Sequence, residues 1–151
     1  MHKIVINNCY GGFSLSPIAI KRFYELKEIL IYFYTYDRNT LYRKDHKLRE
    51  CTYIKINPED LEERDPFIIV TKDFGDSFMR PYDSSIKEIT WCNPERTDPI
   101  LIQVVEELGK EVNGSYASLK IVEFSGDKYR ICEYDGLEYV ETPDSIHWKT
   151  I

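Results

Sequence analysis

The chain lacks the short motifs that mark the common nucleotide-binding and hydrolytic sites. It contains neither the GxGxxG pattern of dinucleotide-binding folds nor the GxxxxGK[ST] phosphate loop, and neither GxSxG nor HExxH. The corresponding enzyme classes therefore have no support in the sequence. A catalytic triad whose members meet only in the fold would leave no such spacing, so that alternative stays open.

Cysteine and histidine are sparse and scattered along the chain. The four cysteines stand singly, without the close pairing that is typical of a zinc site, and the three histidines are equally dispersed. This pattern favours buried free thiols in a reducing compartment over metal ligands or disulfides. We therefore expect no metal and no cofactor.

Long hydrophobic runs and an excess of positive charge are also missing. No apolar stretch approaches the roughly 18 residues of a membrane span, and the amino-terminal residues do not resemble a signal peptide. The net charge of −6 opposes binding to long nucleic acids and to anionic membranes. With 151 residues, 42% of them hydrophobic, the chain fits a single domain, residues 1–151, of a soluble cytoplasmic protein.

The most informative feature present is the opening of the chain. An apolar run, Ile4 to Ile6, leads through a glycine-containing segment to Ser16 and Pro17. This pattern predicts a strand, a glycine loop and a helix that begins with a Ser N-cap and a proline in the first position. Loops between a strand and a helix gather backbone donors, so an anion or nucleotide site is expected here.

The remaining pattern predicts an α/β (α+β) domain with a mixed sheet. Helices are expected at 17–27 and 99–112, a short acidic turn at 58–64, and further strands at 29–36, 50–57, 67–71, 86–91, 119–124, 129–134 and 137–141. The start would be a β-α-β unit, with a right-handed crossover if its strands are parallel. The last three strands are expected to form an antiparallel meander.

Two segments carry competing interpretations. The loop-like stretch 72–85 contains Phe74, Phe78 and Arg80, which suit either a clamp on a base and a phosphate or a lid over the core. The charged stretch 37–49 is either a solvated face or a phosphate-binding arm. Tyrosine, with twelve residues, is unusually frequent, and half-buried sheet packing is favoured over ligand stacking for each of them.

Two further side chains near the predicted loop and helix have alternative roles. Arg96, just before the helix at 99–112, would either help to hold an anion or form a salt bridge with Asp98 or Glu95. Cys9 lies beside the glycine loop and near a helix N-terminus, where a thiol can act as a nucleophile.

Three segments carry a resemblance to a known family: KIVINNCYGGFSLS at 3–16, RTDP with VVEELG between 96 and 109, and EYDG at 133–136. In these segments the chain resembles small proteins encoded by bacteriophages and prophages. Such proteins, when they have α/β cores and aromatic loops, look in general class like phage sponges. Sponges sequester nucleotide signals made by host defence systems, such as cyclic ADP-ribose isomers and cyclic oligonucleotides. The resemblance implies anti-defence activity in the host cytoplasm.

These observations lead to a primary hypothesis and two alternatives. The primary hypothesis is a non-enzymatic binder of a nucleotide-like small molecule, forming a homo-oligomer because a pocket between subunits excludes water well. Its expected ligand-binding residues are Asn7, Asn8, Tyr10, Gly11, Gly12, Phe13, Ser14, Arg80 and Arg96. The alternatives are a hydrolase or transferase that acts on a nucleotide-like substrate, and a protein inhibitor with a tyrosine-rich surface.

Overall fold

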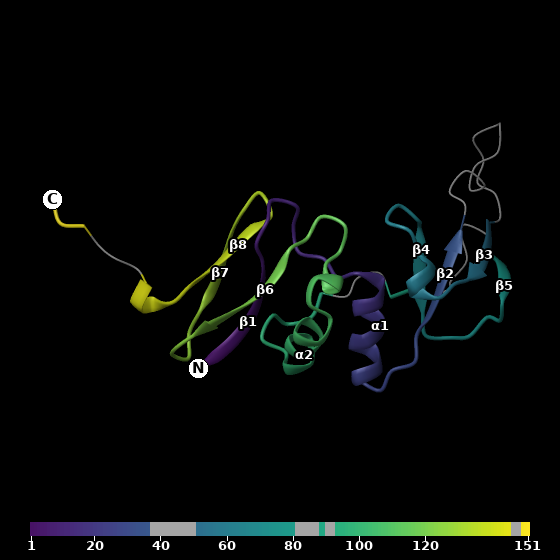
Figure 1. Cartoon of the computed structure of the whole chain (residues 1–151), viewed down its shortest axis with the longest axis horizontal. Helices are drawn as coiled ribbons and strands as arrows, with labels where there is room; N and C mark the ends of the chain where they lie inside the picture. Colours follow the sequence, from purple (N-terminus) through teal and green to yellow (C-terminus); the bar gives the residue numbers. More distant parts are fainter. Residues whose placement is uncertain (37–50, 81–87, 90–92, 146–148) are drawn as a thin grey trace. The chain divides into compact units, whose positions relative to one another are not determined.

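The computed structural model of the chain describes residues 1–36, 51–80, 88–89, 93–145 and 149–151. It divides into two compact units: Met1–Lys27 with Asn93–Ile151, and Glu28–Cys92. The described residues form two α-helices and eight strands in three antiparallel sheets (Figure 1). This confirms the predicted α+β class. One domain spanning the chain stays a prediction, because a compact unit need not fold alone.

The first unit is built around a pair of antiparallel strands. β1 (His2–Asn7) pairs with β6 (Leu119–Phe124), with Ile4 opposite Val122. Alternate residues of β1 point to opposite faces. The face that carries Ile4 and Ile6 packs with Phe124 and against the hairpin of β7 (Arg130–Tyr134) and β8 (Leu137–Glu141). The helix α2 (Pro99–Leu108) contacts both β1 and β6.

The two helices begin as the sequence predicts. Ser16 caps α1 (Pro17–Leu26), and its side chain accepts a hydrogen bond from the Ala19 amide at 3.2 Å. Asp98 caps α2 (Pro99–Leu108) in the same way, through the Ile100 amide at 2.8 Å. Both helices have proline in the first position, where its missing N–H leaves no bond unmade.

The predicted end of the second helix is wrong. α2 stops at Gly109, whose φ of +55° ends the regular hydrogen-bonding pattern, and a 3₁₀ helix, η3 (Gly109–Val112), follows. Asn113 and Gly114 instead lie beyond η3. The Asn113 side chain accepts a hydrogen bond from the Leu119 amide at the start of β6. The apolar stripe predicts the helix correctly but does not predict the change in helix type.

The second unit contains a four-stranded antiparallel sheet in the order β4-β2-β3-β5. Its strands are β2 (Tyr32–Tyr36), β3 (Cys51–Lys55), β4 (Phe67–Val70) and β5 (Ser77–Arg80). A 3₁₀ helix, η2 (Pro58–Asp60), follows Asn57 in place of a longer acidic turn. Tyr34 and Tyr53 are buried and pack with Phe78, which confirms sheet packing for these two tyrosines.

Three predictions about strand connections are wrong. The opening has the predicted order of β1, α1 and β2, but the two strands do not share a sheet, because β1 pairs antiparallel with β6 and β2 lies between antiparallel partners in another sheet. The expected meander is only the β7–β8 hairpin, since β6 pairs with β1. The stretch 72–85, predicted as loop, contains β5. Periodicity identifies a strand, but which strand it pairs with depends on contacts distant in sequence.

Several predictions fall outside the described residues. These are the charged stretch 37–49, all of the strand 86–91 except Glu88 and Ile89, and the packing of Trp148. Glu88 forms an isolated antiparallel bridge with Val70 at the edge of the second unit's sheet. Among the helices that the structure describes, none is long and apolar enough to cross a membrane.

Candidate functional site

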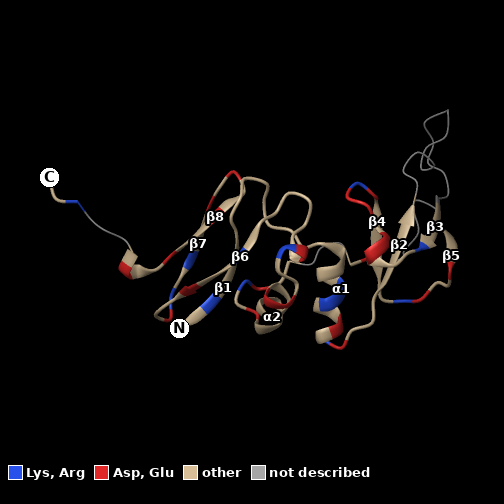
Figure 2. Cartoon of the chain, viewed as in Figure 1, with Lys and Arg blue, Asp and Glu red and all other residues tan. Residues whose placement is uncertain are grey.

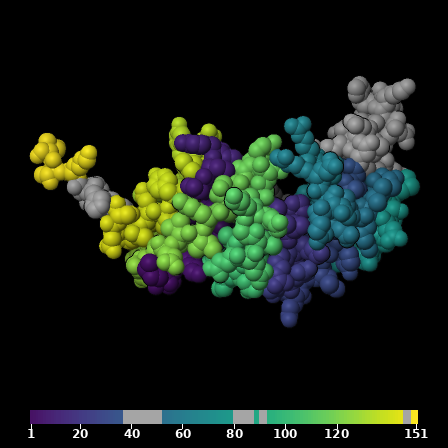
Figure 3. Space-filling view, in the orientation of Figure 1, coloured from purple at the N-terminus to yellow at the C-terminus, as the bar shows by residue number. Residues whose placement is uncertain are grey.

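The glycine loop that joins β1 to α1 packs closely against two other segments of the first unit. A Cβ atom on Gly11 would lie 1.8 Å from the carbonyl oxygen of Tyr116. A Cβ atom on Gly136, in the β7–β8 turn, would lie 2.5 Å from the Gly12 nitrogen and 2.7 Å from the Tyr10 oxygen. The glycines therefore admit the protein's own backbone. In Figure 3 purple atoms of the amino-terminal segment lie beside yellow atoms of the β7–β8 hairpin and green atoms of the segment before β6.

Asn7 joins these three segments and is fully buried. Its side-chain amide donates to the carbonyl oxygens of Cys9 and Gly136, at 2.9 and 2.8 Å. Its side-chain oxygen accepts from the Ser118 amide at 2.8 Å and from the Cys9 thiol at 3.4 Å. Both donors and both acceptor positions are thus used within the protein. The predicted role of Asn7 in ligand contact is replaced by a role in shaping the loop.

Arg96 is held by Glu138, which lies on β8. The guanidinium donates to both carboxylate oxygens of Glu138, at 2.7 and 3.0 Å, and stacks on the Phe13 ring with its carbon 3.5 Å from the ring centroid. The side chains of Arg96 and Glu138 are only 17% and 10% exposed. The salt-bridge alternative for Arg96 is therefore observed, but with neither Asp98 nor Glu95 as the partner. No sequence spacing indicates Glu138.

The Arg96–Glu138 ion pair also completes the free edge of β1. The Val5 amide donates to the Arg96 carbonyl at 2.9 Å, and the Asn7 amide donates to a carboxylate oxygen of Glu138 at 2.7 Å. An Arg96 nitrogen lies 3.4 Å from the Val5 carbonyl oxygen, at the limit of a hydrogen bond. The Arg96 backbone carbonyl and the Glu138 carboxylate thus supply partners that a neighbouring strand would otherwise provide.

Two backbone amides of the loop remain available. In the part of the chain that the structure describes, the amides of Gly11 and Phe13 donate to no protein group, whereas the Gly12 amide closes the turn at Tyr10 and Gly11. Gly11 is exposed, and Gly12 and Phe13 are half-buried. Amides without a protein partner at a loop can bind an oxygen of a ligand. Gly11 and Phe13 therefore keep the capacity that the sequence assigns to them.

Three exposed tyrosines lie in the loop or in the segments that contact it. Tyr10, Tyr116 and Tyr134 are 64, 73 and 74% exposed. Tyr10 precedes Gly11, the backbone of Tyr116 contacts Gly11, and Tyr134 lies two residues before Gly136. Tyr10 is predicted from the sequence to belong to the site, whereas Tyr116 and Tyr134 are not. Nothing in the local sequence indicates that Tyr116 and Tyr134 would meet a loop at the other end of the chain.

The other predicted site residues have different surroundings. Asn8 is exposed and its backbone amide donates to the Ser118 carbonyl at 2.7 Å. Ser14 packs against Gly114, where a Cβ atom would lie 2.1 Å from the Ser14 hydroxyl. Arg80 is the last residue of β5 in the second unit, and its side chain is outside the described part. It therefore adds nothing to the site as described.

Cys9 has no catalytic partner among the described residues. Its thiol is half-buried and lies 3.0 Å from the Tyr116 carbonyl oxygen and 3.4 Å from the Asn7 side-chain oxygen. Neither oxygen can act as a general base. Cys132 is likewise free and half-buried, so neither of these thiols is fully buried as the sequence predicts. The other two cysteines, or their side chains, are outside the described part.

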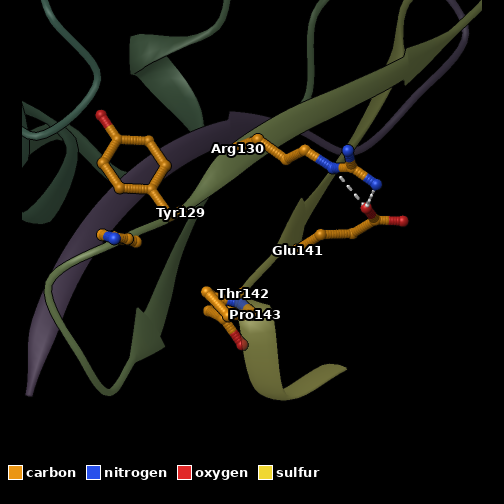
Figure 4. Close-up of a pocket in the computed structure, with 6 residues that line it drawn as sticks. Tyr129, Arg130, Glu141, Thr142 and Pro143 are labelled. Carbon is orange, nitrogen blue, oxygen red and sulfur yellow. Dashed lines mark hydrogen bonds and ion pairs between the residues drawn. The ribbon is translucent and has the colours of Figure 1, made fainter. Parts of the chain in front are cut away.

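A small pocket lies at the opposite end of the β7–β8 hairpin from the glycine loop (Figure 4). Its volume is about 210 Å³, and it is lined by Lys128, Tyr129, Arg130, Glu141, Thr142 and Pro143. Arg130 and Glu141 form an ion pair, drawn with dashed lines in Figure 4. Sites for whole cofactors or drug-sized ligands begin at about 300 Å³. This pocket therefore has room for a fragment but not for a nucleotide.

Comparisons with known proteins leave the assignment to the structure itself. No protein-family model, no curated protein and no solved structure matches this chain. Within the described ranges, no group of three or more His, Cys, Asp or Glu side chains lies close enough together to hold a metal ion.

Proposed function

We propose that this protein is a non-enzymatic binder that sequesters a nucleotide-derived small molecule at the loop from Tyr10 to Phe13. The resemblance to phage proteins supports a signal of host anti-phage defence as the ligand, such as a cyclic ADP-ribose isomer or a cyclic oligonucleotide. The observation that carries the proposal is the combination of the available amides of Gly11 and Phe13 with three exposed tyrosines in the loop and in the segments that contact it.

Each part of this site has a task in binding such a ligand. Backbone amides donate hydrogen bonds to phosphate or ribose oxygens, and tyrosine rings stack on bases. The loop is held in place by Asn7, whose four side-chain contacts connect the glycine loop, the β7–β8 turn and the segment before β6. A loop fixed in this way loses little conformational entropy when it binds a ligand.

The geometry supports binding over catalysis. Cys9 is the one nucleophilic side chain that the sequence analysis connects with the loop. In the described part of the chain, its thiol contacts only a carbonyl oxygen and an amide oxygen. A nucleophile of this kind needs an adjacent base.

A protein partner is the second candidate ligand, because the three tyrosine rings are largely exposed. Tyrosine is enriched at protein interfaces, where its ring packs and its hydroxyl forms hydrogen bonds. Binding of a host defence protein on this surface would make the chain a protein inhibitor.

The proposal is tested by incubating the purified protein with a panel of cyclic mono- and dinucleotides and cyclic ADP-ribose isomers. A bound ligand should raise the Tm, and heat denaturation should release it chemically intact. Release of an altered product would identify an enzyme. No rise in Tm with any member of the panel, together with co-purification of a host protein, would favour the protein inhibitor.

Tyrosine variants locate the site. Tyr116→Ala and Tyr134→Ala should each weaken binding at least about fivefold, the lower range for loss of one stacked base. Tyr139→Ala is the matched control, because Tyr139 is also exposed but lies along β8, away from the turn. If Tyr139→Ala weakens binding as much as the other two, the ligand does not lie at the glycine loop.

A further inference from the structure

We propose that the ligand of the Tyr10–Phe13 loop is an aromatic molecule of low negative charge. A nucleoside fits this description, and so does a cyclic nucleotide whose phosphates are all diesters with one negative charge each. A nucleotide with a terminal phosphate, which carries up to two charges on that group, does not. This inference rests on the proposed function and specifies the ligand class of the same site. It follows from the charged groups around the loop and from the contacts that already occupy them.

The guanidinium nearest to the loop is already neutralised. Arg96 stacks on Phe13, inside the loop, but both of its contacts to Glu138 are short, at 2.7 and 3.0 Å. A ligand phosphate would have to displace this carboxylate to pair with the guanidinium. The positive charge that the sequence assigns to phosphate binding is therefore used within the fold.

Displacing Glu138 would also expose the edge of β1. The same carboxylate accepts a hydrogen bond from the backbone amide of Asn7 at 2.7 Å, and both side chains of the ion pair are mostly buried. A buried ion pair that loses one partner leaves an uncompensated charge, and a buried amide without an acceptor adds a further cost. We therefore infer that the ion pair stays closed when the ligand binds.

The β7–β8 turn places two carboxylates beside the loop. A side-chain oxygen of Glu133 accepts a hydrogen bond from the backbone amide of Gly136 at 3.0 Å, and the Gly136 backbone packs against Gly12. Asp135 is adjacent in the chain and exposed. Neither carboxylate is in an ion pair with any residue that the structure describes. Figure 2 shows this acidic tip of the hairpin in red.

The electrostatic potential at the loop is thus negative, and only uncharged backbone amides attract a ligand oxygen. Both carboxylates lie well within a Debye length of Gly12, about 10 Å at 0.1 M salt, so their repulsion of a ligand anion is only partly screened. The amides of Gly11 and Phe13 can donate hydrogen bonds to a phosphate oxygen, but they carry no net positive charge. Each further negative charge adds repulsion without a new partner.

The test compares ligands that differ only in phosphate charge. Dissociation constants are measured by calorimetry for adenosine, 3′,5′-cyclic AMP, AMP and ATP, and for the guanosine series, at about 0.02 and 0.2 M salt. We expect adenosine and cyclic AMP to bind alike, and AMP and ATP to bind at least about fivefold more weakly at the lower salt, since one charge at contact distance is worth about that factor. The difference in affinity between the two groups of ligands should be smaller at the higher salt concentration.

A conservative variant separates charge from shape. Asp135 has a φ of +49°, and asparagine also adopts this conformation readily, so Asp135→Asn should keep the turn. Asp135→Asn should reduce the difference in affinity between ATP and adenosine, while the affinity for adenosine stays unchanged. Asp127→Asn, in the turn between β6 and β7, is the control and should leave this difference as it is.

The outcomes distinguish this inference from the proposed function. If affinity rises with each added phosphate and Asp135→Asn has no effect, the low-charge ligand class is wrong, although a nucleotide-binding function remains. If neither nucleoside series binds at millimolar concentration and the cyclic panel also leaves the Tm unchanged, the proposed function fails, and the inference fails with it.

Discussion

The two compact units satisfy their buried polar groups in different ways. In the first unit, the Glu138 carboxylate accepts hydrogen bonds from Arg96 and from the Asn7 amide, so that an ion pair completes the edge of a strand. In the second unit, the Tyr34 hydroxyl donates to the Gly75 carbonyl at 2.8 Å and accepts from the Phe74 amide at 3.0 Å. The first unit thus uses a mostly buried ion pair, and the second an aromatic hydroxyl.

The tyrosines of the two units differ in burial. Tyr34 and Tyr53 of the second unit are buried in an aromatic cluster, whereas Tyr116 and Tyr134 of the first unit are exposed in segments that contact the glycine loop. A buried ring with a satisfied hydroxyl stabilises a fold, while an exposed ring is available to a ligand. The abundance of tyrosine in the composition therefore reflects two separate uses.

The largest effect is expected from removing the carboxylate of the first unit. Glu138→Ala should lower the free energy of unfolding by about 3 to 5 kcal/mol, because it leaves a buried guanidinium and the Asn7 amide without their acceptor. Urea denaturation measures the change. Glu123→Ala, an exposed glutamate on β6, is the control and should cost less than about 0.5 kcal/mol.

A double substitution of the ion pair tests the explanation for this loss of stability. Exchanging both members of the ion pair, as Arg96→Met with Glu138→Leu, should recover part of the stability, because no buried charge then remains. A Glu138→Ala variant that loses less than about 1 kcal/mol would show that the ion pair is not what holds this edge.

A smaller effect is expected at the hydroxyl of the second unit. Tyr34→Phe should lower the free energy of unfolding by about 1 to 3 kcal/mol, because the Gly75 carbonyl and the Phe74 amide lose their partner while the ring packing remains. Tyr116→Phe should change stability by less than about 0.5 kcal/mol, because its ring is exposed. Equal losses in the two variants, measured in urea, would remove the distinction between buried and exposed tyrosines.

The smallest effect is expected from exposed ion pairs in acid. The hydrogen bond from Arg22 lowers the pKa of Glu107 to about 2, and the hydrogen bond from Lys55 lowers the pKa of Asp73. Both carboxylates have a lower pKa in the folded state, so they stabilise it at neutral pH, and this contribution is lost as the pH falls through the folded pKa. For Glu107 the loss should lie between pH 4.5 and about 2.

Matched variants compare these pairs across the two units. Glu107→Gln in the first unit and Asp73→Asn in the second should each make the Tm fall less steeply in acid than in the wild type. Both effects should be small and should decrease at 1 M salt, because the four side chains are about one third to one half exposed. An unchanged acid limb in Glu107→Gln would show that this pair does not persist in solution.

Local signals in the sequence account for most of the elements. Ser16-Pro17 and Asp98-Pro99 predict both helix starts, because N-caps and first-turn prolines act within a few residues. The apolar run before Asn7 predicts β1, and Asp135-Gly136 predicts the tight turn, where both residues have positive φ. These features are encoded in neighbouring residues, so they can be identified without the tertiary structure.

The candidate site is only partly predictable for the opposite reason. The glycine loop is evident in the sequence, but its surroundings come from residues more than one hundred positions away, Tyr116, Tyr134 and Glu138. Asn7 and Arg96 are polar residues near a loop, which by sequence alone resemble ligand contacts. Only the folded chain reveals that Arg96 is already paired with Glu138, and that the Asn7 side chain is already hydrogen-bonded to backbone groups.

The sequence by itself determined the α+β class, the helix starts and the position of the glycine loop, because capping, turn chemistry and periodicity act over short distances. The tertiary structure alone decided which strands pair, which tyrosines are buried and which charge neutralises Arg96. Those outcomes depend on segments that are distant in the chain and meet only when the apolar faces of β1, β6 and the β7–β8 hairpin are buried together.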